Sequence, residues 1–156
     1  MQRIALTRGQ YALVDDEDYS WLNSFKWYAQ KTRVSYYAAR KVRVGDGQII
    51  IYMHRLILGV DSQVDHKDRD SLNNTRDNLR RATTSQNACN REKRPGSSKY
   101  RGVYRVKKTG RWAAAIRLEG TMKHLGSFGD EAEAAKAYDL EAQHRGVYAR
   151  LNFPIT

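Results

Sequence analysis

The sequence has few cysteines and prolines, and it lacks long apolar runs. It contains a single cysteine, Cys89, so no disulfide can form within the chain and no zinc site built on several cysteines can be assembled. The longest apolar stretches, residues 49–53 and 56–58, are far too short to span a bilayer. Only two of the 156 residues are proline, and 40% are hydrophobic, which excludes a Pro-rich disordered chain. We therefore expect a folded, cytoplasmic protein with no membrane partner.

Acidic residues are outnumbered by basic ones. The chain has 28 Lys and Arg residues against 17 Asp and Glu, which gives a net charge of +11. The excess is concentrated late in the chain, because residues 93–119 contain nine basic side chains and one acidic side chain. Such a balance is typical of proteins that bind polyanions such as nucleic acids.

A change of composition near residue 95 divides the chain. The segment Arg94-Pro95-Gly96-Ser97-Ser98 has the turn-forming and flexible residues of a linker. We predict a first domain over residues 1–94, a linker over 95–98 and a second domain over 99–156. Helical and strand patterns occur in both domains, so the expected fold class is α+β.

In the first domain, alternating patterns predict short strands, and capping residues predict short helices between them. Asp16 can cap a helix that buries Tyr19, Leu22 and Phe25, and Gly59 can end a second helix. The expected strands cover residues 10–14, 27–31, 36–44 and 48–52, and the second helix covers 53–58. Next come a strand ending at 66, a polar loop over 67–77, a strand over 78–82 and a helix that opens at Thr84 or Ser85.

The second domain shows three alternating stretches and one Ala-rich helix. The stretches cover residues 100–106, 111–118 and 122–128, which predicts an antiparallel three-stranded sheet. Asp130 can cap a helix that runs to about His144 and has Ala134 and Tyr138 on one face. We expect that helix to cover one side of the sheet.

Polar functional residues are densest between residues 64 and 87. His66 precedes Asn78 by 12 positions, and Asn78 precedes Asn87 by nine. The segments concerned are Val64-Asp65-His66-Lys67-Asp68, Leu72-Asn73-Asn74, Asp77-Asn78-Leu79-Arg80 and Ser85-Gln86-Asn87. Their order and spacing resemble the HNH nuclease motif, a ββα-metal finger, in the H-N-N variant known from phage and intron-encoded enzymes. The resemblance implies a homing-type DNA endonuclease that leaves 3′-hydroxyl and 5′-phosphate ends.

These residue types suit phosphodiester hydrolysis, which needs a base for the attacking water and positive charge beside the phosphate. His66 is the base candidate, since imidazole has an ordinary pKa of about 6.5. Asp65 and Asn87 supply hard oxygen ligands that suit Mg²⁺ or Mn²⁺, and one ion is expected. Asn90, one helical turn beyond Asn87, is an alternative ligand. By resemblance, the amide of Asn78 bridges the loop backbone and orients the strand that carries His66.

Each of these residues also has a structural interpretation. Asp and Asn are common in turns and caps for local reasons, and His66 could be a buried structural histidine. His54, just ahead of the motif, is assigned a structural or phosphate-contact role. Successive residues on a regular strand point to opposite faces, so we expect the strand to break between Asp65 and His66.

A second set of segments covers most of residues 98–154. It consists of Tyr100-Arg101-Gly102-Val103, Gly110-Arg111-Trp112-Ala113-Ala114-Ala115-Ile116-Arg117, Leu125-Gly126-Ser127-Phe128, Glu133-Ala134-Ala135, Ala137-Tyr138-Asp139 and Leu151-Asn152-Phe153. These segments resemble the plant ethylene-response-factor (Apetala-type) DNA-binding domain. In that family a three-stranded sheet lies in the DNA major groove, which is wide enough to admit it. Tyr104, Ala115 and His124 replace residues common in the family, so the plant target sequence does not carry over.

Basic residues on or near the predicted strands are the candidate DNA contacts. Arg can bridge guanine acceptors, and Lys neutralises phosphate. The set consists of Arg101, Arg105, Arg111, Arg117 and Lys123, together with Trp112, and of Arg40 and Arg43 on the predicted hairpin of the first domain. The alternatives are a solvated sheet face, a charged edge strand for the hairpin, and core packing for Trp112 and Tyr138.

We predict a DNA endonuclease that nicks or cleaves duplex DNA, uses a His general base and one divalent ion, and is positioned by its C-terminal domain. The alternative is a non-catalytic transcriptional regulator in which the finger is a structural element. The expected partners are duplex DNA and Mg²⁺ or Mn²⁺, with no small-molecule cofactor, and a monomer is favoured over an oligomer. The resemblance implies a phage or intron origin in a bacterial host.

Overall fold

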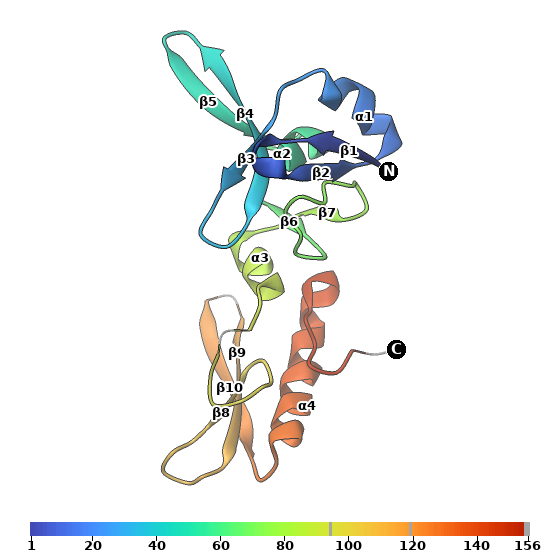
Figure 1. Cartoon of the computed structure of the whole chain (residues 1–156). Coiled ribbons are helices and arrows are strands. Elements are labelled where there is room, and N and C mark those ends of the chain that lie inside the picture. The colour runs from blue at the N-terminus through green and yellow to red at the C-terminus, as the bar shows by residue number, and fades with distance from the viewer. Residues whose placement is uncertain (94, 119, 155–156) are drawn as a thin grey trace. The chain divides into compact units, whose positions relative to one another are not determined.

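The computed structural model describes residues 1–93, 95–118 and 120–154, which form two compact units, Met1–Asn87 and Ala88–Thr156. Both units contain helices and antiparallel strands (Figure 1), which agrees with the predicted α+β class. The boundary between them falls before the predicted linker, whose neighbour Arg94 lies outside the described residues. Within the described part of the chain, no helix is long and apolar enough to cross a membrane.

The first unit is built from short elements. They are β1 (Gln2–Ala5), β2 (Tyr11–Val14), α1 (Asp16–Asn23), β3 (Tyr28–Lys31), β4 (Tyr36–Val44), β5 (Gly47–Tyr52), α2 (Met53–Leu58), β6 (Val64–His66), β7 (Leu79–Arg81) and α3 (Thr84–Asn90), whose last turn enters the second unit. Three antiparallel sheets result: β1 with β2, β3-β4-β5, and β6 with β7. Strand β1 is absent from the sequence prediction, because only Ile4 of its four residues is buried and its pairing with β2 leaves no local pattern.

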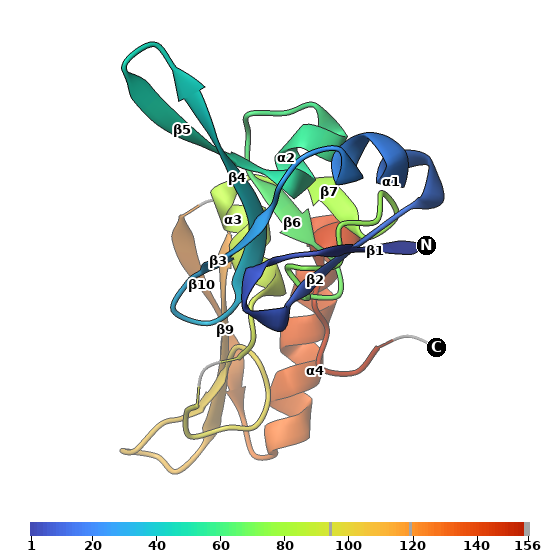
Figure 2. The same cartoon turned by 45° about the horizontal axis from the view of Figure 1, so that its top comes forward.

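One apolar cluster holds the first unit together. Val14, Leu22, Met53 and Leu79 meet there from different elements, and the indole of Trp27 donates to the carbonyl of Leu22 at 2.8 Å. Burial of such side chains is worth about 1.5–3 kcal/mol each and is the main stabilising contribution. The cluster therefore packs α1 and α2 against strands of all three sheets, including β2, β6 and β7 (Figure 2).

Phe25 does not belong to this cluster, contrary to the sequence prediction. Helix α1 ends at Asn23, and the side chain of Phe25 is exposed. The guanidinium of Arg40 lies 3.9 Å from the centre of the Phe25 ring. This cation–π contact gives Arg40 a structural partner within the unit.

The polar loop between β6 and β7 is held by hydrogen bonds to distant parts of the first unit. The backbone of Leu13 accepts from the amide of Asn74 at 2.7 Å and donates to Leu72 at 2.8 Å. The guanidinium of Arg76 donates twice to the buried carboxylate of Asp18, at 2.8 Å each, and these bonds raise the pKa of Arg76. The loop is therefore fixed from two sides, although it carries no regular structure.

The second unit is a three-stranded antiparallel sheet packed against one helix. Its elements are β8 (Val103–Arg105), β9 (Trp112–Leu118), β10 (Thr121–Phe128) and α4 (Glu131–Ala142), in the sheet order β10-β9-β8. The carboxylate of Asp130 accepts from the amides of Ala132 and Glu133, so the predicted cap begins α4. Small residues of α4, Ala134 and Ala135, pack against Val103 and Ala114 of the sheet. The predicted sheet and covering helix are both present, and the helix ends at Ala142 rather than near His144.

Candidate active site

Strand β6 runs without interruption through both candidate residues. Asp65 pairs with Arg80 and His66 pairs with Leu79 in a regular antiparallel register with β7. The predicted break between Asp65 and His66 is therefore wrong, and the two side chains leave opposite faces of the strand. The chain turns only after His66, where the amide of Lys67 donates to the carbonyl of Asn78 at 2.9 Å.

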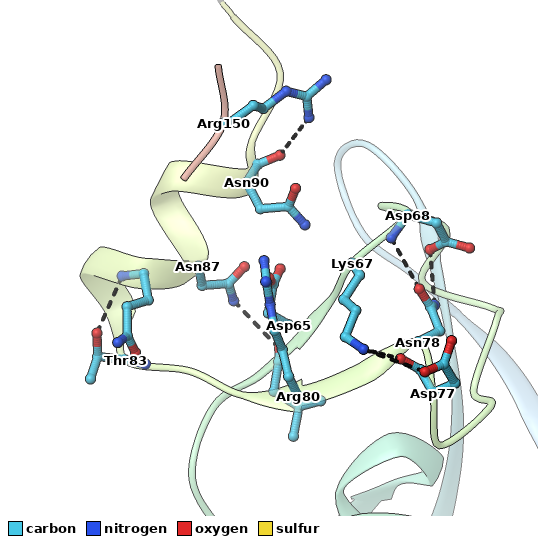
Figure 3. A network of polar contacts seen from close by, with 12 residues as sticks. Asp65, Lys67, Asp68, Asp77, Asn78, Arg80, Thr83, Asn87, Asn90 and Arg150 are labelled. Atoms are coloured by element: carbon cyan, nitrogen blue, oxygen red, sulfur yellow. Dashed lines mark hydrogen bonds and ion pairs between the residues drawn. The ribbon is translucent and has the colours of Figure 1, made fainter. Parts of the chain in front are cut away.

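The carboxylate of Asp65 lies in an ion pair across the two strands. Asp65 is 3% exposed, and its Oδ2 accepts from Nε of Arg80 at 2.8 Å and from Nη2 at 2.6 Å. Figure 3 shows the guanidinium of Arg80 lying along the side chain of Asp65. A carboxylate buried to this extent requires a positive partner, and Arg80 supplies it.

His66 lies on the other face of β6, among aromatic rings. Its ring centre is 5.1 Å from that of His54 and 6.0 Å from that of Tyr37. Burial lowers the pKa of His66, while nearby carboxylates act in the opposite direction. A lowered pKa keeps the imidazole neutral at pH 7, and the neutral form is the one that can accept a proton.

His54, on α2, is the more deeply perturbed of the two histidines. It stacks on Tyr52 at 5.6 Å between ring centres, and its buried Nδ1 has no hydrogen-bond partner among the described residues. Burial, then the charges of His66 and Arg55, lowers the pKa of His54 to about 3. Its surroundings support the structural role rather than the phosphate contact.

The side chain of Asn78 ties the two ends of the polar loop together. Its Oδ1 accepts from the amide of Asp68 at 3.0 Å, and its Nδ2 donates to the Asp68 carboxylate at 2.9 Å and to the carbonyl of Asn73 at 2.8 Å (Figure 3). Lys67 and Asp77, the residues that follow His66 and precede Asn78, also form an ion pair. These contacts hold the backbone immediately after His66.

Helix α3 brings Asn87 to the same strand. The amide of Thr83 donates to Oε1 of Gln86 at 2.8 Å, and the amide of Gln86 donates to Oγ1 of Thr83 at 3.2 Å, so α3 begins with a capping box. The Nδ2 of Asn87 donates to the carbonyl of Val64 at 3.5 Å, and Figure 3 shows the side chain reaching from α3 toward β6. Asn90 falls in the second unit, where its carbonyl accepts from Arg150 at 3.0 Å.

The oxygen donors beside β6 are of the kind that hard divalent cations accept. Among the described residues, no group of three or more His, Cys, Asp or Glu could hold a metal ion. Asp65 and Asn87 offer one carboxylate and one carboxamide oxygen, and both are ligands that Mg²⁺ and Mn²⁺ accept. Because Nδ2 of Asn87 faces the carbonyl of Val64, Oδ1 of Asn87 points away from that carbonyl. Two protein ligands would leave the remaining positions for phosphate and water.

In the second unit, a β-bulge decides which side chains of β10 face the helix. The register between β9 and β10 shifts between His124 and Gly126, so the side chains before the bulge are reversed relative to simple alternation. Lys123 therefore lies on the α4 side and pairs with Glu141 at 2.9 Å. Trp112 packs into the same helix-side core, which supports the structural alternative given for it.

The opposite face of this sheet carries few cations. Cross-strand register places there Tyr104, Ala113, Ala115, Arg117, Met122, His124 and Ser127. Arg117 Nη1 donates to the carbonyl of Gly120 at 3.1 Å, and Arg111 Nη2 donates to that of Ser127 at 3.0 Å. The guanidinium of Arg101 donates to the carbonyl of Arg91, and that of Arg105 lies 5.8 Å from the Trp112 ring. Each predicted DNA-contacting arginine of this unit thus also has a partner within it.

Comparison with known proteins identifies the family. No family model matches the sequence. The chain is 30% identical over 142 residues to the uncharacterized HNH endonuclease L560 of Acanthamoeba polyphaga mimivirus, an alignment that covers 87% of this chain and 71% of the viral protein. The chain belongs to the HNH endonuclease family.

This HNH family member is also similar to plant transcription factors over part of its length. It is 50% identical over 64 residues to the AP2-like ethylene-responsive transcription factor ANT of Arabidopsis thaliana, and 48% identical over 64 residues to the factor CRL5 of rice. The alignments cover 39% of this chain but only 12% and 10% of the plant proteins. The viral relative does not test the predicted phage or intron origin, which stays a prediction.

Two residues of the candidate site have no role in the sequence prediction. Arg80 lies within the motif, and antiparallel pairing of β6 and β7 sets it directly opposite Asp65. Asp68 bonds twice to the side chain of Asn78. The alternation of the two strands could have identified Arg80, whereas the Asp68 contact depends on the loop conformation.

Proposed function

We propose that this HNH family protein is a homing-type endonuclease that hydrolyses phosphodiester bonds of duplex DNA with the help of one divalent ion. The observation that carries the proposal is that one compact unit supplies all four candidate residues. Strand β6 carries Asp65 and His66, the loop before β7 carries Asn78, and α3 carries Asn87. We interpret β6, β7 and α3 as the ββα-metal finger of the family.

His66 acts as the general base in this mechanism. Its lowered pKa keeps the ring neutral, so it can take the proton of the attacking water at neutral pH. Asn78 positions the base, because its amide fixes the backbone that follows His66. Asp65 and Asn87 would hold Mg²⁺ or Mn²⁺, which would supply positive charge where negative charge develops on the phosphate and the leaving oxygen.

The opposite orientations of Asp65 and His66 constrain where the DNA can lie. Because β6 ends at His66 and the chain turns there, a phosphate placed across this end can have the carboxylate on one side and the imidazole on the other. His66 is 6% exposed in the free protein, so the aromatic rings around it must move aside before the imidazole can approach a phosphate. We therefore expect binding to increase the exposure of Tyr37 and His54.

The second unit is assigned to DNA binding. Its support is the similarity to plant transcription factors and the excess of basic residues in this part of the chain. A sheet can enter the major groove, and the face opposite α4 is the one left open within the unit. Tyr104, Met122 and His124 on that face favour apolar and aromatic base contacts over the bidentate arginine contacts that read guanine.

Plasmid relaxation tests the nuclease proposal. The wild-type protein should convert supercoiled DNA to nicked or linear forms with Mg²⁺ and should lose this activity in EDTA. His66→Ala should bind DNA normally and lose at least about a hundredfold in rate, as expected for removal of a general base. His144→Ala, which removes a histidine outside the site, is the matched control and should keep full activity.

A non-catalytic transcriptional regulator is the second candidate. It is favoured by the similarity to plant transcription factors and by the ion pair that occupies the Asp65 carboxylate. Both candidates bind DNA. A wild-type protein that binds duplex DNA yet never nicks it in Mg²⁺ or Mn²⁺ would support the regulator.

A further inference from the structure

Arg80 occupies the position where the proposed site needs a cation. It lies directly across from Asp65 in the β6–β7 pair, and both Nε and Nη2 donate to the same carboxylate oxygen, Oδ2. The two side chains are 16% and 4% exposed, so solvent screens their attraction little. None of the roles described above uses this guanidinium.

The charge balance at Asp65 makes Arg80 a competitor for divalent ions. In the free protein the buried carboxylate is neutralised by the guanidinium. A divalent ion at the same carboxylate would therefore meet a fixed positive charge at close range. An ion at Oδ1 and the guanidinium at Oδ2 would repel each other at close range, so each weakens the binding of the other.

We propose that Arg80 is a positioning residue that keeps Asp65 from divalent ions until DNA arrives and then transfers its hydrogen bonds to a phosphate of the bound strand. A guanidinium suits both states, because its planar pair of donors matches carboxylate and phosphate oxygens equally well. The inference rests on the proposed nuclease function. Since coupling between two ligands is reciprocal, DNA should tighten ion binding and the ion should tighten DNA binding by the same factor.

Mn²⁺ binding to the DNA-free, full-length protein tests this role without any activity measurement. Loss of the free Mn²⁺ signal in electron paramagnetic resonance titrations gives the affinity. Arg80→Gln removes the charge while keeping a hydrogen-bond donor for Asp65, and it should bind Mn²⁺ at least tenfold more tightly than wild type, which corresponds to about 1.4 kcal/mol.

Arg81→Gln is the matched control, because it removes the same charge from the next residue of β7, whose side chain is exposed on the other face of the strand. Its Mn²⁺ affinity should stay within about twofold of wild type, as expected for a screened surface charge. Asp65→Asn added to Arg80→Gln should abolish the gain. If Arg81→Gln tightens Mn²⁺ binding as much as Arg80→Gln, general electrostatics explains the effect and the inference fails.

Adding a duplex in the cleavage-deficient His66→Ala background tests the coupling. DNA should tighten Mn²⁺ binding clearly when Arg80 is present and much less in Arg80→Gln. If Arg80→Gln does not fold, as judged by circular dichroism, Arg80→Lys replaces it and should tighten Mn²⁺ binding by a smaller factor, since one ammonium replaces two paired donors.

Two outcomes separate this inference from the proposed function. If Arg80→Gln binds Mn²⁺ no better than wild type while Asp65→Asn abolishes binding, the ion site stands and the role of Arg80 is overturned. If no variant binds Mn²⁺ with or without DNA, the divalent-ion step of the proposed function fails, and the inference fails with it.

Discussion

Both units tie distant backbone segments together with an asparagine that bonds to an aspartate, but the two pairs have different surroundings. In the second unit, Asn152 bonds to the 6% exposed carboxylate of Asp139 and exchanges hydrogen bonds with the backbone of Arg101. In the first unit, Asn78 bonds to Asp68, which is exposed. The pair with the buried carboxylate closes a core, whereas the pair with the exposed carboxylate holds a loop beside a candidate site. The same contact therefore contributes mainly to stability in one unit and mainly to positioning in the other.

The largest expected effect concerns the close packing of the second unit. Gly102 has φ +72°, and a Cβ there would lie 1.9 Å from the Tyr138 ring and 2.8 Å from the carbonyl of Ala115. Gly102→Ala should lower the free energy of unfolding of this unit by about 3 kcal/mol or more, from overpacking and backbone strain together. Gly110→Ala, at φ +70° with open space, should cost only about 1–2 kcal/mol. Equal losses in urea denaturation would contradict the packing account.

The next largest effect should come from removing the side chain of Asn152, which bonds to the buried carboxylate of Asp139. Asn152→Ala removes a side-chain donor from the Asp139 carboxylate, which keeps its backbone donors, and breaks the link to Arg101. We expect a loss of about 2–3 kcal/mol in the stability of the second unit, because a buried charge loses a partner. Thermal denaturation followed by circular dichroism measures it. If Asn152→Ala lowers stability less than Asn78→Ala does, the claim that the Asn152 contact contributes mainly to stability is contradicted.

The buried histidine pair should make the first unit sensitive to acid. The pKa of His54 is lowered to about 3, so the unfolded state takes up a proton near pH 6.5 while the folded state does not. Stability should therefore be full above about pH 7 and fall by about 2 kcal/mol from this group alone between pH 7 and pH 5. His54→Phe, which keeps an aromatic ring, should flatten this part of the profile. Identical pH profiles would show that His54 is not the group responsible.

Loss of the Asn78–Asp68 bonds should have the smallest effect on stability and a clear effect on activity, because the Asp68 carboxylate is exposed. Asn78→Ala removes three hydrogen bonds in a partly solvated loop, for a loss of about 1 kcal/mol. The nicking rate should nevertheless fall by about tenfold or more, because the backbone after His66 loses its support. Faster hydrogen exchange at the amide of Asp68 would report the loosened loop. Unchanged nicking with a loosened loop would remove Asn78 from the site.

Much of the fold could be predicted because its signals are local. Strand β4 and helix α2 have the predicted limits, since alternation defines the first and Gly59, at φ +60°, ends the second. Strand β8 is shorter than predicted, because Gly102 adopts a conformation that no extended strand allows. Strand β1 is not predicted, because only one of its four residues is buried and it is recognised through its pairing with β2.

The candidate site was predictable in its residue types but not in its arrangement. Asp65, His66, Asn78 and Asn87 follow from order and spacing, whereas the opposite orientations of the first two follow from the register of β6. The position of Lys123 depends on a one-residue bulge that reverses part of β10. Gly126, with φ +129° at the bulge, is the local sign of this shift, because a glycine inside a strand often marks a bulge.

Metal rescue of Asp65→Cys tests the central claim most directly, namely that the Asp65 face of β6 is part of a divalent-ion site for phosphodiester hydrolysis. A thiolate is a poor ligand for Mg²⁺ but a good one for softer ions. The variant should bind DNA, fail to nick plasmid in Mg²⁺, and regain nicking when Mn²⁺ or Cd²⁺ is supplied. Nicking by Asp65→Cys in Mg²⁺ at the wild-type rate would contradict the claim.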